Sequence, residues 1–264
     1  MLYQKYDNLI HKLRDMKSVI VAFSGGVDST LLLYVAKESL GENVLAVIGS
    51  SCFFPESEKD AAVRICEELG VRYKILELDP LAVDGVKENP KNRCYLCKKA
   101  MLGQIQKIAE AEGYEFIVEG SNMDDEGDFR PGAQAVRELG IKSPLKEAEL
   151  YKAEIRELSK EKGLPTWDKP SLACLASRIP YGDELSVETL EMVDKAESFL
   201  FGMGFKQLRV RVHGTVARIE LLEEDISKAM EDDMRRKIKS ELKKLGFKYV
   251  TIDLSGFKSG SMNI

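Results

Sequence analysis

Short runs rich in β-branched residues alternate with helical patterns over about the first 160 residues of the chain. The runs predict strands, mostly buried on both faces, at residues 18–23, 43–50, 71–78 and 115–121. Helical patterns begin between them, near Asp28, Pro55 and Tyr95. Because strands that alternate with helices form a parallel sheet covered on both faces, the sequence predicts a Rossmann-like α/β domain. Its ligands are expected at the carboxyl ends of the strands.

A loop rich in small residues, 170–184, precedes a different pattern. The downstream sequence predicts a helix, two strands, a longer helix and a last strand, at residues 186–201, 207–213, 216–221, 224–245 and 248–254. That order is typical of a small α+β domain. We therefore expect a larger α/β domain over residues 1–180 and a smaller α+β domain over residues 181–264.

The composition excludes several classes of protein. With 39 Lys and Arg against 44 Asp and Glu among 264 residues, the formal net charge is −5, which argues against DNA as a partner. No apolar run approaches the roughly 18 residues needed to span a bilayer, and no signal peptide is recognisable, so no membrane partner is expected. We therefore expect a cytoplasmic protein whose five cysteines are reduced.

The first predicted strand runs directly into SGGVDST, which opens a helix. Gly25 and Gly26 permit a positive φ and close backbone approach to a ligand. The positive end of the helix dipole then lies beside the hydroxyl groups of Ser24, Ser29 and Thr30. Such a turn can hold phosphate, although it lacks the lysine of a Walker loop. The alternative is a tight strand-to-helix turn with a serine cap.

A second polar segment, GSNMDDEGDFRPG, follows the fourth predicted strand. Asp124, Asp125 and Asp128 lie close in sequence to Arg130. Because ligand contacts gather at the carboxyl ends of parallel strands, we expect this segment beside the phosphate turn. Carboxylates suit a hard cation such as Mg²⁺. The alternative is a solvated loop.

Cys94 and Cys97 form a C-x2-C pair, and Cys174 lies far away in sequence. Three thiolates can ligate three irons of a 4Fe-4S cluster and leave the fourth iron open, where sulfide can bind. The adjacent Lys98 and Lys99 favour thiolates and anionic substrates. A zinc site and a redox dithiol are the alternatives. The remaining thiols are expected in other roles, Cys66 in the core and Cys52 as a bystander.

Arg209 and Arg211 are two residues apart in LRVRVHG, so they lie on the same face of a predicted strand. Their guanidinium groups could fork onto a phosphate, with Arg178 as a third member of the group. The alternative is a solvated edge strand that carries charges against aggregation. His213 has no partner visible in the sequence, and two histidines exclude a His-rich metal site.

The string SGGVDST resembles the signature of the PP-loop ATP pyrophosphatases, which cleave ATP between the α and β phosphates and adenylate an oxygen of the substrate. The resemblance implies that pyrophosphate binds to Ser24, Gly25, Gly26 and Ser29, with Asp28 at Mg²⁺. It adds Ala22 to the nucleotide site. The second polar segment resembles the family's G-x-N-x-D-D motif, which implies nucleotide and Mg²⁺ contacts for Gly120, Asn122, Asp124 and Asp125, and an anion contact for Arg130.

SGGVDS, GSNMDD, DFRPG, CLASRIPYG, LRVRVHG and IDLSGFKSGS together cover nearly the whole chain. In combination they are similar to the LarE family of ATP-dependent sulfur transferases in nickel-pincer cofactor biosynthesis. The resemblance implies ATP and Mg²⁺ as cofactors, and adenylation of pyridinium-3,5-biscarboxylic acid mononucleotide followed by replacement of the activated oxygen by sulfur. It implies catalytic roles for Asp28, Cys174, Arg209 and Arg211, and substrate or phosphate contacts for Lys99, Arg130, Arg178, Arg209 and Arg211. Glu220 and Asp253 fall within the similar region without an assigned role.

The cysteines depart from part of the LarE pattern. Some members have only the cysteine that matches Cys174, and they sacrifice its sulfur to become dehydroalanine. The additional Cys94 and Cys97 imply the branch with a 4Fe-4S cluster, in which sulfide or another sulfur donor supplies the sulfur. The resemblance is compatible with a homo-oligomer.

Three other functions remain as alternatives. A tRNA thiolation enzyme would use the same adenylation, but the acidic net charge, the absence of paired zinc-ribbon cysteines and the lack of a basic stripe argue against it. Carboxyl amidation would leave the C-x2-C pair idle. An adenine-nucleotide or metal-binding sensor is the reading outside the enzymes, and the intact phosphate and acidic motifs argue against it.

Overall fold

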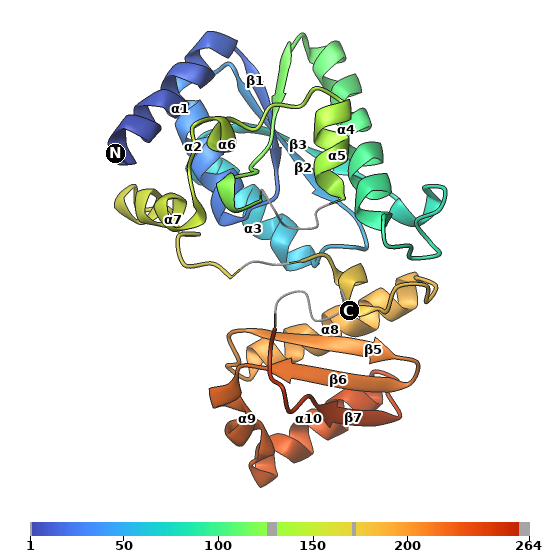
Figure 1. The fold of residues 1–264 in the computed structure, drawn as a ribbon. Helices are drawn as coiled ribbons and strands as arrows, with labels where there is room; N and C mark the ends of the chain where they lie inside the picture. Colours follow the sequence, from blue (N-terminus) through green and yellow to red (C-terminus); the bar gives the residue numbers. More distant parts are fainter. Residues whose placement is uncertain (1, 126–130, 171–172, 259–264) are drawn as a thin grey trace. The chain divides into compact units, whose positions relative to one another are not determined.

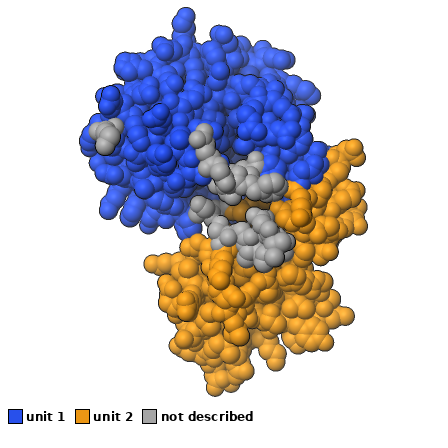
Figure 2. All heavy atoms as spheres, viewed as in Figure 1, with its two compact units in different colours: residues 1–83, 92–172 blue, residues 84–91, 173–264 orange. Residues whose placement is uncertain are grey.

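The computed structural model describes residues 2–125, 131–170 and 173–258. The chain forms two compact units, coloured separately in Figure 2. Unit 1 comprises residues 1–83 and 92–172, and unit 2 comprises residues 84–91 and 173–264. The sequence placed the division at residue 180 and did not anticipate that 84–91 joins unit 2. Asn89 ties this short segment to unit 2, because its Nδ2 donates to the carbonyls of Ile179 and Pro180 at 3.2 and 2.7 Å.

Unit 1 is built on a four-stranded parallel sheet, drawn in Figure 1. The strands are β1 (Val19–Phe23), β2 (Val44–Ser50), β3 (Arg72–Glu77) and β4 (Phe116–Val118). Their order is β3-β2-β1-β4, so the chain adds β2 and β3 on one side of β1 and then returns to place β4 on its other side. The carboxyl ends of β1 and β4 therefore lie side by side, which confirms the predicted α/β architecture.

Helices cover both faces of this sheet, because successive side chains of β1 alternate between two apolar clusters. Val19 and Val21 pack in one cluster, and Ile20 packs in the other. The first cluster includes residues of α1 (Leu2–Met16), α2 (Val27–Leu40), α3 (Glu56–Glu68), α6 (Pro144–Glu147) and α7 (Lys152–Glu161). The second includes residues of α4 (Arg93–Glu112) and α5 (Gly132–Glu138). The sequence analysis anticipated α2, α3 and α4 but not the other four.

The prediction of burial on both faces was wrong for β3. Five of its six residues are exposed, including the large side chains of Tyr73 and Ile75. The reason is its place at the edge of the sheet, where it pairs with β2 alone among the described strands. The strand carries the charged residues Arg72, Lys74 and Glu77. Charged side chains are typical of edge strands, because they discourage pairing with another chain.

Unit 2 contains a three-stranded mixed sheet of β5 (Leu208–His213), β6 (Val216–Leu221) and β7 (Tyr249–Ile252). β5 and β6 are antiparallel, whereas β6 and β7 are parallel. The helices are α8 (Val187–Gly202), α9 (Glu223–Met230) and α10 (Asp232–Lys244). The single helix predicted over 224–245 is thus two helices, because Glu231 is extended at φ −57° and ψ 142°. The small α+β domain is otherwise confirmed.

Short 3-10 helices complete the described fold, namely η1 (Pro80–Ala82), η2 (Met123–Asp125) and η3 (Leu175–Arg178). Among the described residues, no helix combines the length and apolar character needed to cross a membrane.

Candidate active site

The phosphate turn lies between β1 and α2, where the sequence predicted it. Ser24 and Ser29 join its two ends through their hydroxyl groups, whose oxygens are 3.0 Å apart. Gly25 has a φ of +68°, which a residue with a side chain rarely adopts, and an added Cβ would lie 3.1 Å from Cβ of Ala62 in α3. The turn therefore passes close to α3. Its backbone lies at the N-terminus of α2, a favourable place for an anion.

The hydroxyl of Thr30, which the sequence analysis placed at the phosphate turn, is not accessible there. It is buried and has no hydrogen-bond partner in the part of the chain that the structure describes. Ala22, in contrast, is partly exposed near the carboxyl end of β1.

Lys169 braces the phosphate turn, a contact that sequence reasoning missed. Its Nζ donates to the carbonyl oxygen of Gly25 at 3.1 Å and to Oε2 of Glu58 in α3 at 2.7 Å. Arg156 holds the same segment by donating to the Lys169 carbonyl oxygen at 2.8 Å. Because a single lysine in a loop carries no periodic signal, nothing in the sequence pointed to it.

Asp28 connects the phosphate turn to the second polar segment. Its Oδ1 accepts a 3.0 Å hydrogen bond from Nδ2 of Asn122, and its Oδ2 accepts from Nζ of Lys152 at the start of α7. Asn122 is only 3% exposed, so its amide is fixed in this position. The structure therefore brings Asp28 and Asn122 together as expected and adds Lys152, which the sequence analysis did not identify.

Asp124 and Asp125 order the second polar segment rather than standing apart as a solvated loop. Oδ2 of Asp125 accepts from the Asn122 amide at 2.9 Å, and Oδ2 of Asp124 accepts from the Lys152 amide at 2.6 Å. The Asp124 amide donates in turn to Oδ1 of Asn122 at 2.9 Å. Carboxylates are thus gathered beside the N-terminus of α2, where a magnesium nucleotide requires them. Arg130 lies outside the described residues.

Gly120 gives a direct test of this geometry. A Cβ there would lie 3.0 Å from the Ser29 amide nitrogen and 3.3 Å from Cβ of Asp28. We expect Gly120→Ala to push the segment away from the phosphate turn and weaken Mg·ATP binding by about tenfold or more, as measured by calorimetry. Gly103→Ala in α4 is the matched control, because its Cβ would meet nothing within 4 Å. Equal affinities in the two variants would contradict the proposed contact of Gly120 with the nucleotide site.

The predicted metal-ligating cysteines are thiols rather than disulfides. Cys94 and Cys97 lie in the first turns of α4 in unit 1, where Arg93 donates to Sγ of Cys94 at 3.8 Å. Cys174 is partly exposed and immediately precedes η3 in unit 2. Within residues 2–125, 131–170 and 173–258, no three His, Cys, Asp or Glu side chains form a group that could hold a metal ion. Thiolates are the ligands that iron-sulfur clusters take, so the chemistry of this donor set fits such a cluster.

The other two cysteines differ in their surroundings. Cys66 is fully buried, and burial raises the pKa of its thiol to about 12, so the predicted core role is confirmed. Burial, together with Asp79, also raises the pKa of Cys52. Both thiols are therefore less reactive than an ordinary cysteine at neutral pH.

Lys99 is engaged with protein side chains. Its Nζ donates to Oε2 of Glu138 in α5 at 2.8 Å and to the hydroxyl of Tyr95 at 2.7 Å. These hydrogen bonds raise the pKa of Lys99, whereas hydrogen bonds from Lys99, Tyr95 and Gln134 lower the pKa of Glu138 to about 2. Lys99 thus ties α4 to α5 in the described structure, and a substrate contact would require it to change partners.

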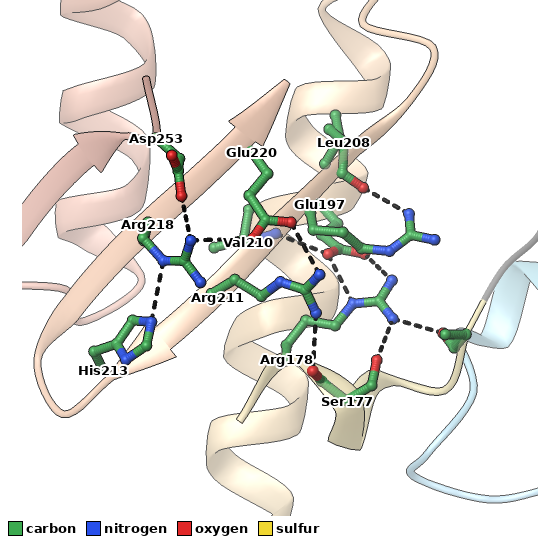
Figure 3. Close-up of polar contacts among 12 residues, drawn as sticks. Ser177, Arg178, Glu197, Leu208, Val210, Arg211, His213, Arg218, Glu220 and Asp253 are labelled. Atoms are coloured by element: carbon green, nitrogen blue, oxygen red, sulfur yellow. Dashed lines mark hydrogen bonds and ion pairs between the residues drawn. The ribbon is translucent and has the colours of Figure 1, made fainter. Parts of the chain in front are cut away.

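The predicted arginines form a buried cluster in unit 2, shown in Figure 3. Arg178 makes a two-pronged ion pair with Glu197 of α8, with Nε–Oε1 and Nη2–Oε2 distances of 2.9 and 2.8 Å. Its Nη1 donates to the carbonyl oxygen of Ala173 at 2.6 Å and to that of Cys174 at 3.1 Å. Arg178 therefore fixes the backbone at Ala173 and Cys174.

Arg209 and Arg211 lie on one face of β5, and each is only 5% exposed. The solvated edge strand is therefore excluded. Arg211 donates to Oε2 of Glu220 and to the Ser177 carbonyl oxygen, both at 2.9 Å. Arg209 donates to the Leu208 carbonyl oxygen at 2.6 Å and stacks over the Phe257 ring at 5.1 Å. Burial, followed by repulsion from Arg178, lowers the pKa of Arg209 to about 10.

Arg218 supplies the partner of His213 that the sequence did not reveal. Its Nε donates to Nε2 of His213 at 3.1 Å, and its Nη1 forms ion pairs with Glu220 at 3.2 Å and with Asp253. Burial and the charge of Arg218 lower the pKa of His213. Glu220 and Asp253 thus have a visible role, because they neutralise the charges of Arg211 and Arg218 on this sheet (Figure 3).

The buried Arg178–Glu197 ion pair is expected to contribute to the stability of unit 2. Its side chains are 1% and 5% exposed, so Glu197→Gln leaves a buried guanidinium without its counter-charge. We expect the free energy of unfolding to fall by about 3–5 kcal/mol, measured by urea denaturation. Glu191→Gln on the same helix is the control, because it breaks only the solvent-exposed Glu191–Lys195 pair and costs little. A similar small loss in both variants would contradict the assignment of Arg178 as a buried anchor.

Residues 4–107 match the family described as NAD synthase. The chain is 40% identical to the pyridinium-3,5-bisthiocarboxylic acid mononucleotide synthase of Lactiplantibacillus plantarum over 263 residues, which covers 99% of this chain and 95% of that protein. It is also 40% identical over 264 residues to an uncharacterized protein of Synechocystis sp., which covers 100% and 98% of the two chains.

More distant similarity extends to enzymes with other products. The chain is 31% identical to the NH(3)-dependent NAD(+) synthetase of Hyperthermus butylicus over 199 residues, or 71% of this chain and 70% of that enzyme. The match over residues 4–107 includes the phosphate turn and the first three strands of unit 1, whereas the two relatives at 40% identity extend through unit 2 as well.

Proposed function

Because this chain belongs to the LarE family of ATP-dependent sulfur transferases, we propose that it makes the thiocarboxylate of the nickel-pincer cofactor precursor. The proposed substrate is pyridinium-3,5-biscarboxylic acid mononucleotide, one carboxylate of which is adenylated and then converted to a thiocarboxylate. The observation that carries this proposal is the 40% identity to the Lactiplantibacillus plantarum synthase along almost the whole of both chains.

The adenylation step is assigned to unit 1. A carboxylate oxygen is a poor leaving group, and transfer of AMP to it with release of pyrophosphate makes the later displacement feasible. We assign pyrophosphate to Ser24, Gly25, Gly26 and Ser29, next to the N-terminus of α2. The network of Asp28, Asn122, Asp124 and Asp125 supports Mg²⁺ and nucleotide binding there, with Ala22 and Gly120 beside it.

Lys152 adds a functional element to this network. It pairs with Asp28 through its side chain and with Asp124 through its amide. In the absence of a cation it neutralises the carboxylates that we assign to Mg²⁺. With Mg²⁺ held by these carboxylates, the Lys152 ammonium would be available to pair with the phosphates.

The sulfur step is assigned to Cys94, Cys97 and Cys174 as ligands of a 4Fe-4S cluster. When bound, such a cluster supplies an open iron that can carry sulfide. Support comes from the three reduced thiols and from their places in the chain, since each follows closely after a point where the chain passes between the two units. Sulfide attacks the adenylated carbonyl carbon, a carbon-sulfur bond forms, and AMP leaves with the electrons of the broken carbon-oxygen bond.

The arginine cluster is assigned to the phosphate group of the mononucleotide. Arg178, Arg209 and Arg211 are the proposed contacts, and Glu197 and Glu220 hold Arg178 and Arg211 in place. The lowered pKa of Arg209 supports this role, since an anion would relieve the repulsion that Arg178 exerts on it. Lys99 and Arg130 complete the proposed anion contacts. We place the reaction in the cytoplasm, where thiols stay reduced.

The experiment that tests the cluster is anaerobic reconstitution with iron and sulfide, followed by absorption and electron paramagnetic spectra. We expect about four irons per chain in the wild type and their loss in Cys94→Ala. Colourless, iron-free wild-type protein would overturn the cluster and favour the sacrifice of the Cys174 sulfur instead. ATP–pyrophosphate exchange that depends on tRNA rather than on the pyridinium mononucleotide would favour the tRNA thiolation alternative.

A further inference from the structure

A buried carboxylate outside the motifs lies between the cysteine pair and the nucleotide site. Glu119 follows β4, is 6% exposed, and accepts hydrogen bonds from three residues of unit 1. Its Oε2 accepts from Nζ of Lys98 at 2.9 Å, while its Oε1 accepts from the Ser143 hydroxyl at 2.6 Å and from the Ser121 amide at 3.1 Å. Burial raises the pKa of Glu119, but Lys98 and these hydrogen bonds outweigh it and keep the pKa below its usual value. A buried charge with this many partners is held in a single place.

Lys98 connects Glu119 to the cysteine-bearing turn of α4. It directly follows Cys97 and lies one helical turn after Cys94. The start of α5 confines it, because a Cβ on Gly132 would lie 3.1 Å from Cδ of Lys98 and 3.7 Å from the Cys94 carbonyl oxygen. The Lys98 side chain therefore has little freedom to leave Glu119, and the first turns of α4 are fixed with it.

On its other side, Glu119 holds the segment that reaches the phosphate turn. The Ser121 amide that it binds immediately precedes Asn122, which donates to Asp28 at 3.0 Å. Gly120, between Glu119 and Ser121, packs against the Ser29 amide. A continuous set of polar contacts thus runs from the C-x2-C turn through Lys98 and Glu119 to the residues assigned to magnesium nucleotide.

We propose that Lys98 and Glu119 are positioning residues whose ion pair fixes the C-x2-C turn of α4 relative to the nucleotide site. The pair would hold the two proposed cluster ligands Cys94 and Cys97 at a fixed position relative to the residues assigned to magnesium nucleotide. The importance of the pair for catalysis rests on the proposed function, whereas the mechanical connection requires only the two thiols and ATP binding.

Each variant is assayed at the site that the substituted side chain does not contact. Lys98→Met is assayed for Mg·ATP affinity by calorimetry, and we expect the dissociation constant to rise by about tenfold because Ser121 and Asn122 lose their fixed anchor. Glu119→Gln, assayed in the full chain with reduced thiols before iron reconstitution, is expected to be alkylated several-fold faster at Cys94 and Cys97, with Cys52 as the reference in the same molecule. Lys98→Arg keeps the ion pair and should restore Mg·ATP affinity.

Lys74→Met is the matched control. It breaks another ion pair of α4, the exposed pair with Glu112 near the C-terminal end of the helix, so it should change neither readout. Variants that merely lower the melting temperature while the folded protein keeps wild-type affinity and alkylation rates would overturn the proposal. Effects confined to the site that each substituted residue contacts would also overturn it. So would a failure of Lys98→Arg to restore Mg·ATP affinity. A wild type that binds ATP but forms no thiocarboxylate would refute the proposed function and leave this test intact.

Discussion

Asp28→Ala is expected to reduce ATP–pyrophosphate exchange by about a thousandfold or more, and thiocarboxylate formation with it. Asp28 lies in the first turn of α2 and accepts from both Asn122 and Lys152. Its removal takes away a ligand assigned to Mg²⁺ and leaves the Lys152 ammonium without its counter-charge beside the phosphates. The side chain is at a partly exposed surface, so the fold should survive.

The measurement is exchange of labelled pyrophosphate into ATP in the presence of the pyridinium mononucleotide, with circular dichroism to verify folding. Asp28→Asn separates shape from charge, because an amide oxygen can still accept from Asn122 but cannot neutralise a cation. Asp60→Ala on the exposed surface of α3 is the control and should behave as wild type. Normal exchange in a folded Asp28→Ala protein would remove Asp28 from the adenylation site.

Cys174→Ala should abolish thiocarboxylate formation while the exchange of pyrophosphate into ATP continues. The thiol is required whether it ligates the cluster or gives up its own sulfur, whereas the adenylation residues all lie in unit 1. Product is measured by mass spectrometry over several substrate equivalents. Cys52→Ala is the control, since we assign that thiol no role. Full product formation by Cys174→Ala would contradict both sulfur mechanisms.

The wild-type protein then distinguishes the two sulfur mechanisms. A sacrificial Cys174 becomes dehydroalanine, so the Cys174 peptide loses the mass of H₂S and product stops at one equivalent per chain. In the cluster mechanism the peptide keeps its mass, and product continues while sulfide is supplied. Arg209→Ala, which leaves the thiols in place, should weaken substrate binding in both cases.

The local parts of the site could be predicted from the sequence. The strand-turn-helix around Gly25 is determined by neighbouring residues, because a positive φ and a helix N-terminus are local properties. The meeting of Asp28 with Asn122 also followed from the pattern, although 94 residues separate them. Both follow strands of a parallel sheet, and the carboxyl ends of such strands share one edge.

Contacts made by residues without a local signal could not be predicted. Lys152 is 124 residues from Asp28, and Lys169 is 144 residues from Gly25. Each lies in a charged stretch like many others on the surface, and only the packing of α7 and the following loop brings it to the phosphate turn. The ion pair of Lys98 with Glu119 and that of Arg178 with Glu197 belong to the same category.

The sequence by itself therefore determined the order of the strands along the chain, the phosphate turn, the acidic segment and the three cysteines, because periodicity and motif spacing are properties of the chain. The tertiary structure alone decided that β3 is an exposed edge, that Glu231 divides the last long helix, and which cations pair with the buried carboxylates. Such pairs form where burial removes water from a charge, and burial is set by how distant segments pack.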